Sequence, residues 1–276
     1  MNFWNKLFGK MSHSQKTESD FNQYQNDLNK LNLKSSSDLE NLVKPLLRKT
    51  TQLNIQPASR PTENAQLESH FGGLPYFEKG EKWPTKKNGK HLDFIFQIFN
   101  KPELELPKNI ALVQFFYDWE EMPWDTKDEG WLVKIYSKIH PSKIELIPKP
   151  TDLYPSKYCQ IKYKTVQTLP DWEGIDVFGR NASKLSCVLN EDEPWDNYDQ
   201  IVSKLIGEQE YQSQLGGYPT WVQGEATPID SKGKPMKLLF QIDSEDNAGL
   251  MWGDAGLVYV FYDENTGDLE FVLQCH

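Results

Sequence analysis

The sequence predicts an α+β fold with mostly antiparallel sheets, built from two intertwined pseudo-symmetric β-rich repeats and a few helices. The first observation is an internal duplication: residues 69–99 align with residues 213–243 at a constant offset of 144, and 12 of 31 positions are identical. The second is the aromatic content of nine Trp, 12 Tyr and 14 Phe. Aromatic side chains suit the half-buried face of a pleated sheet.

Both copies have the same predicted order of elements. A Gly-Gly-X-Pro sequence opens each copy, where glycine permits positive φ and proline restricts the chain that follows. Hairpin-like turns at residues 88–90 and 232–234 come next. Each turn leads into two apolar strands, the second of which ends in Phe-Tyr-Asp. The expected strands are residues 92–98, 110–118, 236–242 and 255–263.

The two repeats are predicted to share one domain. They span about residues 69–118 and 213–263, and each alone is too small to bury its apolar face. We therefore expect a single domain over residues 37–276. An N-terminal arm or marginal helix at residues 1–36 precedes it.

Local signals place a helix and a strand before the first repeat. Ser37 and Glu40 have capping-box spacing, which starts a helix because each side chain satisfies a free backbone donor of the other. Apolar residues then continue at helical spacing to about residue 48. Pro45 should kink or end this helix, since proline lacks an amide donor. Alternation at residues 51–55 predicts a short strand.

The segments between and after the repeats are predicted to be rich in strands. Residues 198–206 place their apolar side chains on one helical face just before the second repeat. The other candidates are short apolar or alternating runs. These strand candidates are residues 131–136, 143–147, 158–166, 185–189 and 269–275.

The charge distribution argues against nucleic acid as a partner. The net charge is −10, and residues 1–60 carry nine Lys/Arg against five Asp/Glu, so the excess of acidic residues lies in the remainder. An acidic body is repelled by a phosphate backbone. The three cysteines are an odd number without a CxxC pair, which favours a reducing compartment and a cytoplasmic location.

Membrane insertion is not expected from the sequence. No run of about 18 apolar residues occurs. The first residues lack the apolar core and cleavage site of a secretory signal. Phe3, Trp4, Leu7 and Phe8 share one helical face, so a weak interfacial helix at the N-terminus stays open as an alternative.

Several short motifs in order resemble a known family. They are GGLPYF, Trp83-Pro84, FQI, LVQFFYD, GGYPTWVQG, LLFQIDSED, MWGDAGLVYVFY and FVLQC. Together they resemble the YwqG-like proteins, a bacterial domain of unknown function numbered 1963, over roughly residues 38–276. The resemblance implies a cytosolic bacterial protein with a duplicated, sheet-rich α+β fold, and it implies no particular activity. Some relatives are encoded near secreted toxins, which implies an immunity or interaction role.

Catalytic signatures are missing from the sequence, and one acidic loop is the best metal candidate. No HxH, HExxH, GxSxG, Walker A or GxGxxG pattern occurs. Asp243, Glu245, Asn247 and Asp254 stand at the first, third, fifth and twelfth positions of a calcium-type loop. The sixth position holds Ala248 where such loops need glycine. The alternative is a solvated acidic loop, so the sequence predicts no cofactor and leaves a divalent cation at this loop open.

Polar residues repeated in both copies have two interpretations. Gln97 and Gln241 lie within otherwise apolar strands, and a buried amide must be hydrogen-bonded. Each glutamine could tie the turn-rich loop of its own copy to the sheet. Alternatively, the pair could line a ligand cleft between the copies. The paired carboxylates Glu81/Glu225 and Asp118/Asp263 either cap turns or converge as general acid and base.

An acidic and aromatic stretch predicts a protein interface. It contains Trp119, Glu120, Glu121 and Trp124, and aromatic anchors surrounded by charge are typical of interfaces. The alternative is that these aromatic residues pack a long loop onto the core. The complete set of candidate binding residues is Trp83, Gln97, Trp119, Glu120, Glu121, Trp124, Gln241 and Trp252.

The sequence therefore predicts a non-enzymatic binding or protein-interaction module of the cytoplasm. A basic protein such as a toxin is the expected kind of partner, since the body of the chain is acidic. The alternative is an enzyme that acts on a small molecule or depends on a divalent metal, with its site between the two repeats.

Overall fold

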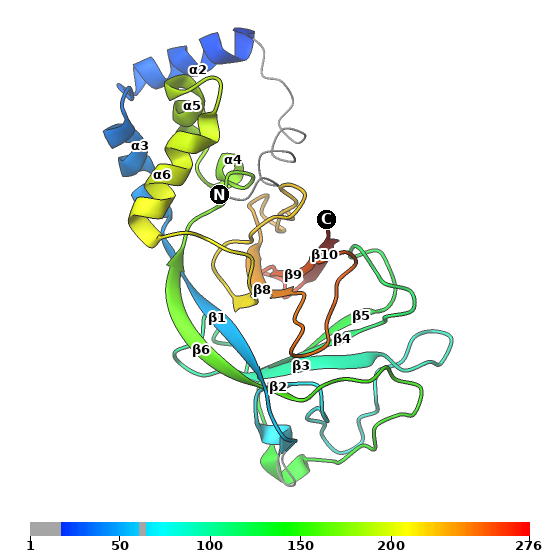
Figure 1. The fold of residues 1–276 in the computed structure, drawn as a ribbon. Helices are drawn as coiled ribbons and strands as arrows, with labels where there is room; N and C mark the ends of the chain where they lie inside the picture. Colours follow the sequence, from blue (N-terminus) through cyan, green and yellow to red (C-terminus); the bar gives the residue numbers. More distant parts are fainter. Residues whose placement is uncertain (1–17, 61–64) are drawn as a thin grey trace.

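The computed structural model describes residues 18–60 and 65–276, and its helices gather at one end of a large sheet (Figure 1). The predicted interfacial helix around Phe3 to Phe8 lies outside the described residues. The α-helices are α2 (Glu18–Lys30), α3 (Ser36–Val43), α4 (Ile175–Phe178), α5 (Arg180–Leu189) and α6 (Pro194–Ile206). No helix in residues 18–60 and 65–276 is long and apolar enough to cross a membrane.

The strands of the described residues form a single sheet, in the order β10-β9-β8-β7-β1-β6-β2-β3-β4-β5. Every neighbouring pair is antiparallel, as the sequence predicted. The strands are β1 (Arg48–Pro57), β2 (His70–Phe71), β3 (Asp93–Phe99), β4 (Leu112–Tyr117), β5 (Trp131–Tyr136), β6 (Cys159–Thr168), β7 (Gln214–Leu215), β8 (Lys237–Asp243), β9 (Leu257–Tyr262) and β10 (Leu269–Gln274).

The long strands β1 and β6 form the centre of the sheet, and four strands lie on either side of them. β1 and β6 pair along their whole length, from Arg48 opposite Thr168 to Pro57 opposite Cys159. β2-β3-β4-β5 and β7-β8-β9-β10 follow one another in the same order outward from this centre. The two flanks each contain one register shift at the same place, in β3 and in β8.

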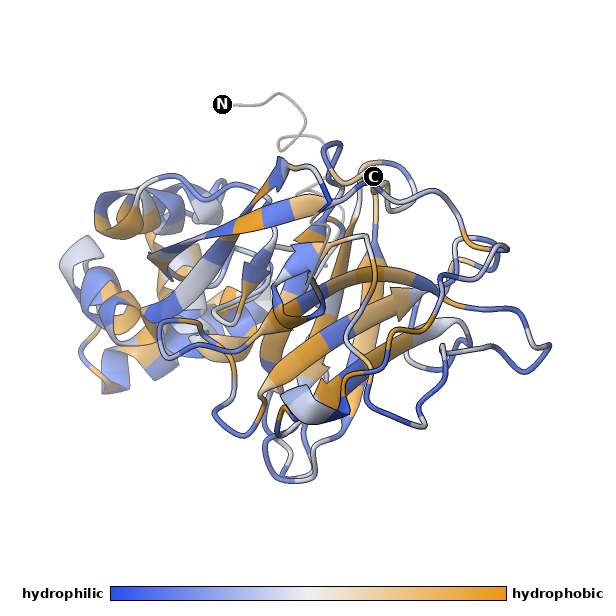
Figure 2. Cartoon of the chain, turned by 90° about the horizontal axis from the view of Figure 1, so that it is seen from below, coloured by the Kyte–Doolittle hydropathy of each residue, from blue (hydrophilic) through white to orange (hydrophobic). Residues whose placement is uncertain are grey.

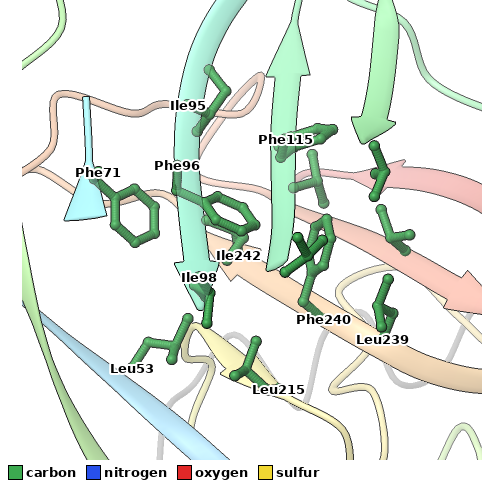
Figure 3. Packing of buried hydrophobic residues seen from close by; sticks show 14 of the residues in the cluster. Leu53, Phe71, Ile95, Phe96, Ile98, Phe115, Leu215, Leu239, Phe240 and Ile242 are labelled. Atoms are coloured by element: carbon green, nitrogen blue, oxygen red, sulfur yellow. The ribbon is translucent and has the colours of Figure 1, made fainter. Parts of the chain in front are cut away.

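The main core lies between the two flanks of the sheet. Each strand of the described residues contributes at least one buried side chain to it. Phe96 of β3 meets Phe240 of β8 edge-on, with ring centroids 5.0 Å apart, and Phe115 of β4 lies beside both (Figure 3). Phe271 of β10 packs on the same ring of Phe115. Neither flank could bury these aromatic faces without the other.

Smaller clusters cover the rest of the molecule. The helices pack on each other through a second core that includes Leu39, Leu185 and Tyr198. The turn-rich loop of each flank folds over the outer face of its own strands, with Phe77 on Phe116 in one flank and Trp221 on Phe261 in the other. In Figure 2, the strands that enclose the main core are mostly apolar, and the connecting loops are mostly hydrophilic.

The structure corrects two strand predictions and shortens one helix. Residues 185–189 are the end of helix α5 and not a strand, because their apolar side chains pack among the other helices. Residues 143–147 are not a strand: Lys143 ends a 3₁₀ turn (Pro141–Lys143), and Ile144 forms a single bridge with Glu78. Helix α3 ends at Val43, before Pro45. Its capping box is Ser35 with Asp38, two residues earlier than predicted.

Candidate functional site

The candidate site lies between a hairpin and a loop of the first flank. The hairpin precedes β3 and is closed by a bridge between Thr85 and His91, with Gly89 at a φ of 84° in its turn. A type of turn that needs positive φ explains the glycine at this position. The loop is residues 118–130, which joins β4 to β5. Met122 within it also has positive φ, at 47°.

Four ion pairs join this hairpin to this loop, and the longest of them is the 3.8 Å contact between Lys86 Nζ and Glu120 Oε2. Lys86 Nζ lies 2.5 Å from Asp118 Oδ2, and both side chains are only 6% exposed. Lys90 pairs with Glu120 at 2.5 Å, where both side chains are about half exposed. A third contact joins Lys87 to Glu129 at the surface. The buried pair fixes the geometry, since exposed pairs stabilise a structure little.

A groove of about 420 Å³ opens between the hairpin and the loop. Charged side chains form its walls, and apolar side chains from the loop complete it. The lining residues are Lys86, Lys87, Asn88, Glu121, Met122, Pro123, Trp124, Asp128 and Glu129. An aromatic anchor beside charged walls matches the composition of protein interfaces.

The backbone of Trp124 is fixed while its side chain is 45% exposed. Its N–H donates to Asp128 Oδ2 at 2.8 Å, and its carbonyl accepts the N–H of Leu273 in β10 at 2.8 Å. The indole lies beside Gly253, since a Cβ placed on this glycine would be 3.8 Å from Cη2 of Trp124. An exposed aromatic side chain on a fixed backbone loses little conformational entropy when it binds a partner.

Hydrogen bonds hold Asp128, Glu120 and Lys86 in their charged forms. Hydrogen bonds from the backbone of Trp124 and Asp125 lower the pKa of Asp128. The hydrogen bond from Lys90 lowers the pKa of Glu120, and the hydrogen bond to Asp118 raises the pKa of Lys86. Asp128 and Lys86, which line the groove, therefore stay charged around neutral pH.

Three of the four predicted binding tryptophans point into the protein. Trp119 stacks on Trp252 with ring centroids 4.7 Å apart and an interplanar angle of 23°. Trp252 is fully buried, and its Nε1 donates to the carbonyl of Asp243. Trp83 is 5% exposed and donates from Nε1 to the carbonyl of Leu92. Trp124 is the member of this set that the groove presents to solvent.

The two glutamines bind the turn-rich loops of their own flanks. Gln97 Oε1 accepts the N–H of Tyr76 at 2.8 Å, and its Nε2 donates to the carbonyls of Gln66 and Glu68. Gln241 accepts the N–H of Thr220 at 3.0 Å and donates to the carbonyl of Gln212. Both amides are fully buried. These hydrogen bonds are those expected if each glutamine fastens its loop to the sheet.

The four metal candidates make separate contacts. Asp243 accepts the N–H of Ser244, and Glu245 accepts the hydroxyl of Ser213 at 2.5 Å. Asn247 uses its amide as a donor to the carbonyl of Ile55. Asp254 offers its backbone carbonyl to His276. Among residues 18–60 and 65–276, no group of three or more His, Cys, Asp and Glu is placed to hold a metal ion.

Sequence reasoning missed two features that the structure brings together. The first is the lysine hairpin opposite the acidic loop; its only signal was the run of lysines at 86, 87 and 90. The second is a carboxylate pair beside Gly174, where an added Cβ would lie 3.1 Å from Glu225 Oε2 and 3.3 Å from Asp171 Oδ1. Burial raises the pKa of Asp171 to about 7. Glu225 stood out as a repeated position, whereas nothing in the sequence singled out Asp171.

The protein therefore has an α+β fold with a rolled antiparallel sheet. It carries a charged groove on its surface. The chain belongs to the family described as Domain of unknown function (DUF1963), which it matches over residues 69–269. The YwqG-like resemblance agrees with this membership. Among curated proteins, none matches the chain. The family description assigns no activity.

Proposed function

We propose that this protein is a non-enzymatic protein-binding module whose docking surface is the groove between the lysine hairpin and loop 118–130. The observation that carries the proposal is Trp124, a half-exposed aromatic side chain on a backbone fixed by hydrogen bonds at both its N–H and its carbonyl. Exposed tryptophans of this kind are the residue type most often found as energetic centres of protein interfaces.

The second flank supports the proposal because the equivalent strands there, β9 and β10, are joined by a shorter loop. β9 and β10 are joined by residues 263–268, where the first flank has residues 118–130. There, Asp263 accepts backbone hydrogen bonds from Ser231 and Asn265, and within residues 18–60 and 65–276 it forms no ion pair with a lysine. The short connection completes an equivalent pair of strands. The pairing of β4 with β5 therefore does not require a loop as long as residues 118–130, which contains Trp124.

The charges of the groove indicate the chemistry of the partner. Glu121, Asp128 and Glu129 line it, against Lys86 and Lys87, and Glu129 already pairs with Lys87. A partner segment that places an apolar side chain on Trp124 and a Lys or Arg toward Glu121 would fit. A basic toxin neutralised in the cytoplasm is one such partner, and the net charge of −10 would speed its association.

Affinity capture with matched variants tests this proposal. Wild-type protein, Trp124→Ala and the control Ile229→Ala are immobilised, and the proteins that each retains from a cell lysate are compared. Ile229 is a suitable control because it is 59% exposed and lies at the corresponding hairpin of the second flank. A retained partner is then purified and titrated.

The expected result is a partner that binds wild type and Ile229→Ala alike. Trp124→Ala should bind it about 30-fold or more weakly, because an interface anchor contributes at least about 2 kcal/mol. Identical retained sets for all three proteins, or none for any, would contradict the proposal.

The alternative function, an enzyme, is favoured by a different observation. Asp171 and Glu225 both lie beside Gly174, and an acid with a pKa of about 7 next to a second carboxylate is a common arrangement for proton transfer. Calorimetric titration with calcium, magnesium and manganese tests the metal-dependent form. Absence of both heat and a thermal shift would rule that form out.

We also propose that the molecule is one domain over residues 37–276, built from two copies of a single unit. Support comes from the equal strand orders, from the register shifts at equivalent places, and from the corresponding pairs His70–Gln97 and Gln214–Gln241. Expression of residues 37–276 tests the boundary. Unfolding of this fragment in two separate transitions would contradict it.

A further inference from the structure

The charges around the groove do not balance, and the excess is negative. Loop 118–130 carries six carboxylates and one lysine, and the hairpin at residues 85–91 carries three lysines. Each hairpin lysine already has a carboxylate of the loop as its partner. The loop therefore presents surplus carboxylates, which attract a cation from outside the chain.

Two of the carboxylates that line the groove have oxygens available for a partner. Glu121 is exposed, and among the described residues it forms no hydrogen bond or ion pair. Oδ2 of Asp128 accepts the N–H groups of Trp124 and Asp125 at 2.8 and 3.1 Å. Its Oδ1 accepts no hydrogen bond from the described part of the chain. The backbone thus fixes the carboxylate of Asp128 and leaves one of its oxygens unused.

The indole of Trp124 lines the same groove on a fixed support. Its loop lies on the edge strand β10, where Thr126 Oγ1 accepts the N–H of Phe271 at 2.7 Å. One end of the ring lies beside Gly253, and 45% of the side chain is exposed. The face of an indole attracts a cation electrostatically, and among the side chains of proteins the cation is most often arginine.

We propose that the groove takes an arginine side chain of its protein partner, with the guanidinium flat on Trp124 and its N–H groups toward Glu121 and Asp128. This inference rests on the proposed protein-binding function and names the residue that the partner contributes. A guanidinium suits the site because it is planar and weakly hydrated, stacks on aromatic rings and donates several hydrogen bonds in one plane. The ammonium of lysine is compact and strongly hydrated, so it gains less from the indole.

The same charges indicate that the arginine belongs to a polypeptide. Free arginine carries an α-carboxylate, which the surplus negative charge of the loop would repel. An arginine within a chain has no charged backbone group, and its methylene stem supplies an apolar surface for the indole of Trp124. The net charge of −10 of the whole protein adds a long-range attraction for a basic segment. The charge complementarity of the groove is therefore to a basic protein that exposes an arginine.

NMR titration of the full chain with two blocked tripeptides tests this inference without any partner. The probes are N-acetylated and C-amidated Ala-Arg-Ala and its lysine analogue Ala-Lys-Ala, at the same low ionic strength. The backbone amide signals of loop 118–130 report binding. Trp124→Leu keeps an apolar side chain beside Gly253 but removes the aromatic face, and Glu121→Gln removes one charge. Glu264→Gln is the control, because this exposed carboxylate lies in the corresponding loop of the second flank.

The arginine peptide should bind about fivefold more tightly than the lysine peptide. Trp124→Leu should abolish this preference, Glu121→Gln should weaken binding of the arginine peptide about threefold, and Glu264→Gln should match wild type. Equal binding of the two peptides, unchanged loop signals, or a preference that Trp124→Leu retains would overturn the inference. A partner captured through Trp124 without any preference for arginine would overturn this inference alone. Arginine binding without any captured partner would instead contradict the proposed function.

Discussion

The ion pair between Lys86 and Asp118 should contribute more to stability than any other charged contact of the groove. Its two atoms are 2.5 Å apart, and each side chain is 6% exposed. Replacement of Asp118 by Ala would leave the Lys86 ammonium buried, with Glu120 at 3.8 Å as the nearest remaining carboxylate. It would also remove the acceptor of the Glu120 N–H.

Loss of one partner of a buried ion pair costs about 3–5 kcal/mol. For a chain of this size, that corresponds to a fall in the midpoint of thermal unfolding of roughly 10 °C. Urea unfolding followed by tryptophan fluorescence measures the free energy directly. The double variant Lys86→Met/Asp118→Ala should regain part of the loss, because it removes the unpaired charge as well.

The matched control is Glu120→Ala, which breaks the exposed pair with Lys90 and the 3.8 Å contact with Lys86 on the same hairpin but leaves the Lys86–Asp118 pair in place. Water screens this pair, so we expect no resolvable change in stability. The reasoning would be refuted by a small effect of Asp118→Ala, equal to that of Glu120→Ala. It would also be refuted if the double variant were no more stable than Asp118→Ala.

Two further predictions concern buried polar groups. Gln97→Leu and Gln241→Leu should each lower the free energy of unfolding by about 2–4 kcal/mol, because each orphans buried backbone groups. Their effects should add, since they share no partner; a coupling above about 1 kcal/mol in a urea double-mutant cycle would instead indicate a shared cleft. Burial raises the pKa of Glu245 to about 7. Between about pH 4.5 and 7, the unfolded chain therefore loses this proton while the folded chain keeps it. The free energy of unfolding consequently falls as pH rises through this window. Glu245→Gln should reduce the fall of the unfolding free energy with pH in that window, where the raised pKa of Asp171 also contributes to the slope, and an unchanged slope would count against the shift.

Most strands could be predicted because their signal is local. β5 was predicted with its observed bounds, and the strands that end in Phe-Tyr were placed within one or two residues of β4 and β9. Alternation and β-branched or aromatic content are properties of the segment itself. The strand prediction for residues 185–189 was wrong because a short apolar run fits a strand or a buried helix equally well. Packing against Leu39 and Tyr198 decided in favour of helix α5.

The candidate site was only partly predictable. The acidic and aromatic composition of loop 118–130 pointed to Trp124, and the structure leaves that side chain half exposed. Composition could not separate it from Trp119, which lies five residues away and stacks on Trp252. Whether a tryptophan is an anchor or a core residue depends on what covers it, and here residues 133 positions apart make the contact.

The sequence by itself determined the elements that repeat: the turn-rich loops, the apolar strands after them and the glutamines within those strands. These elements could be predicted because strand propensity, turn residues and the identities shared by the two copies are properties of the local sequence. Only the tertiary structure decided which side chains those elements cover. The closure of one flank on the other buries Trp252 and partly buries Trp119, whereas Trp83 is buried where the turn-rich loop of the first flank folds over its own strands. The same closure covers the edge at β10 and leaves the edge at β5 open, because hydrogen-bond pairing and burial depend on contacts between distant segments.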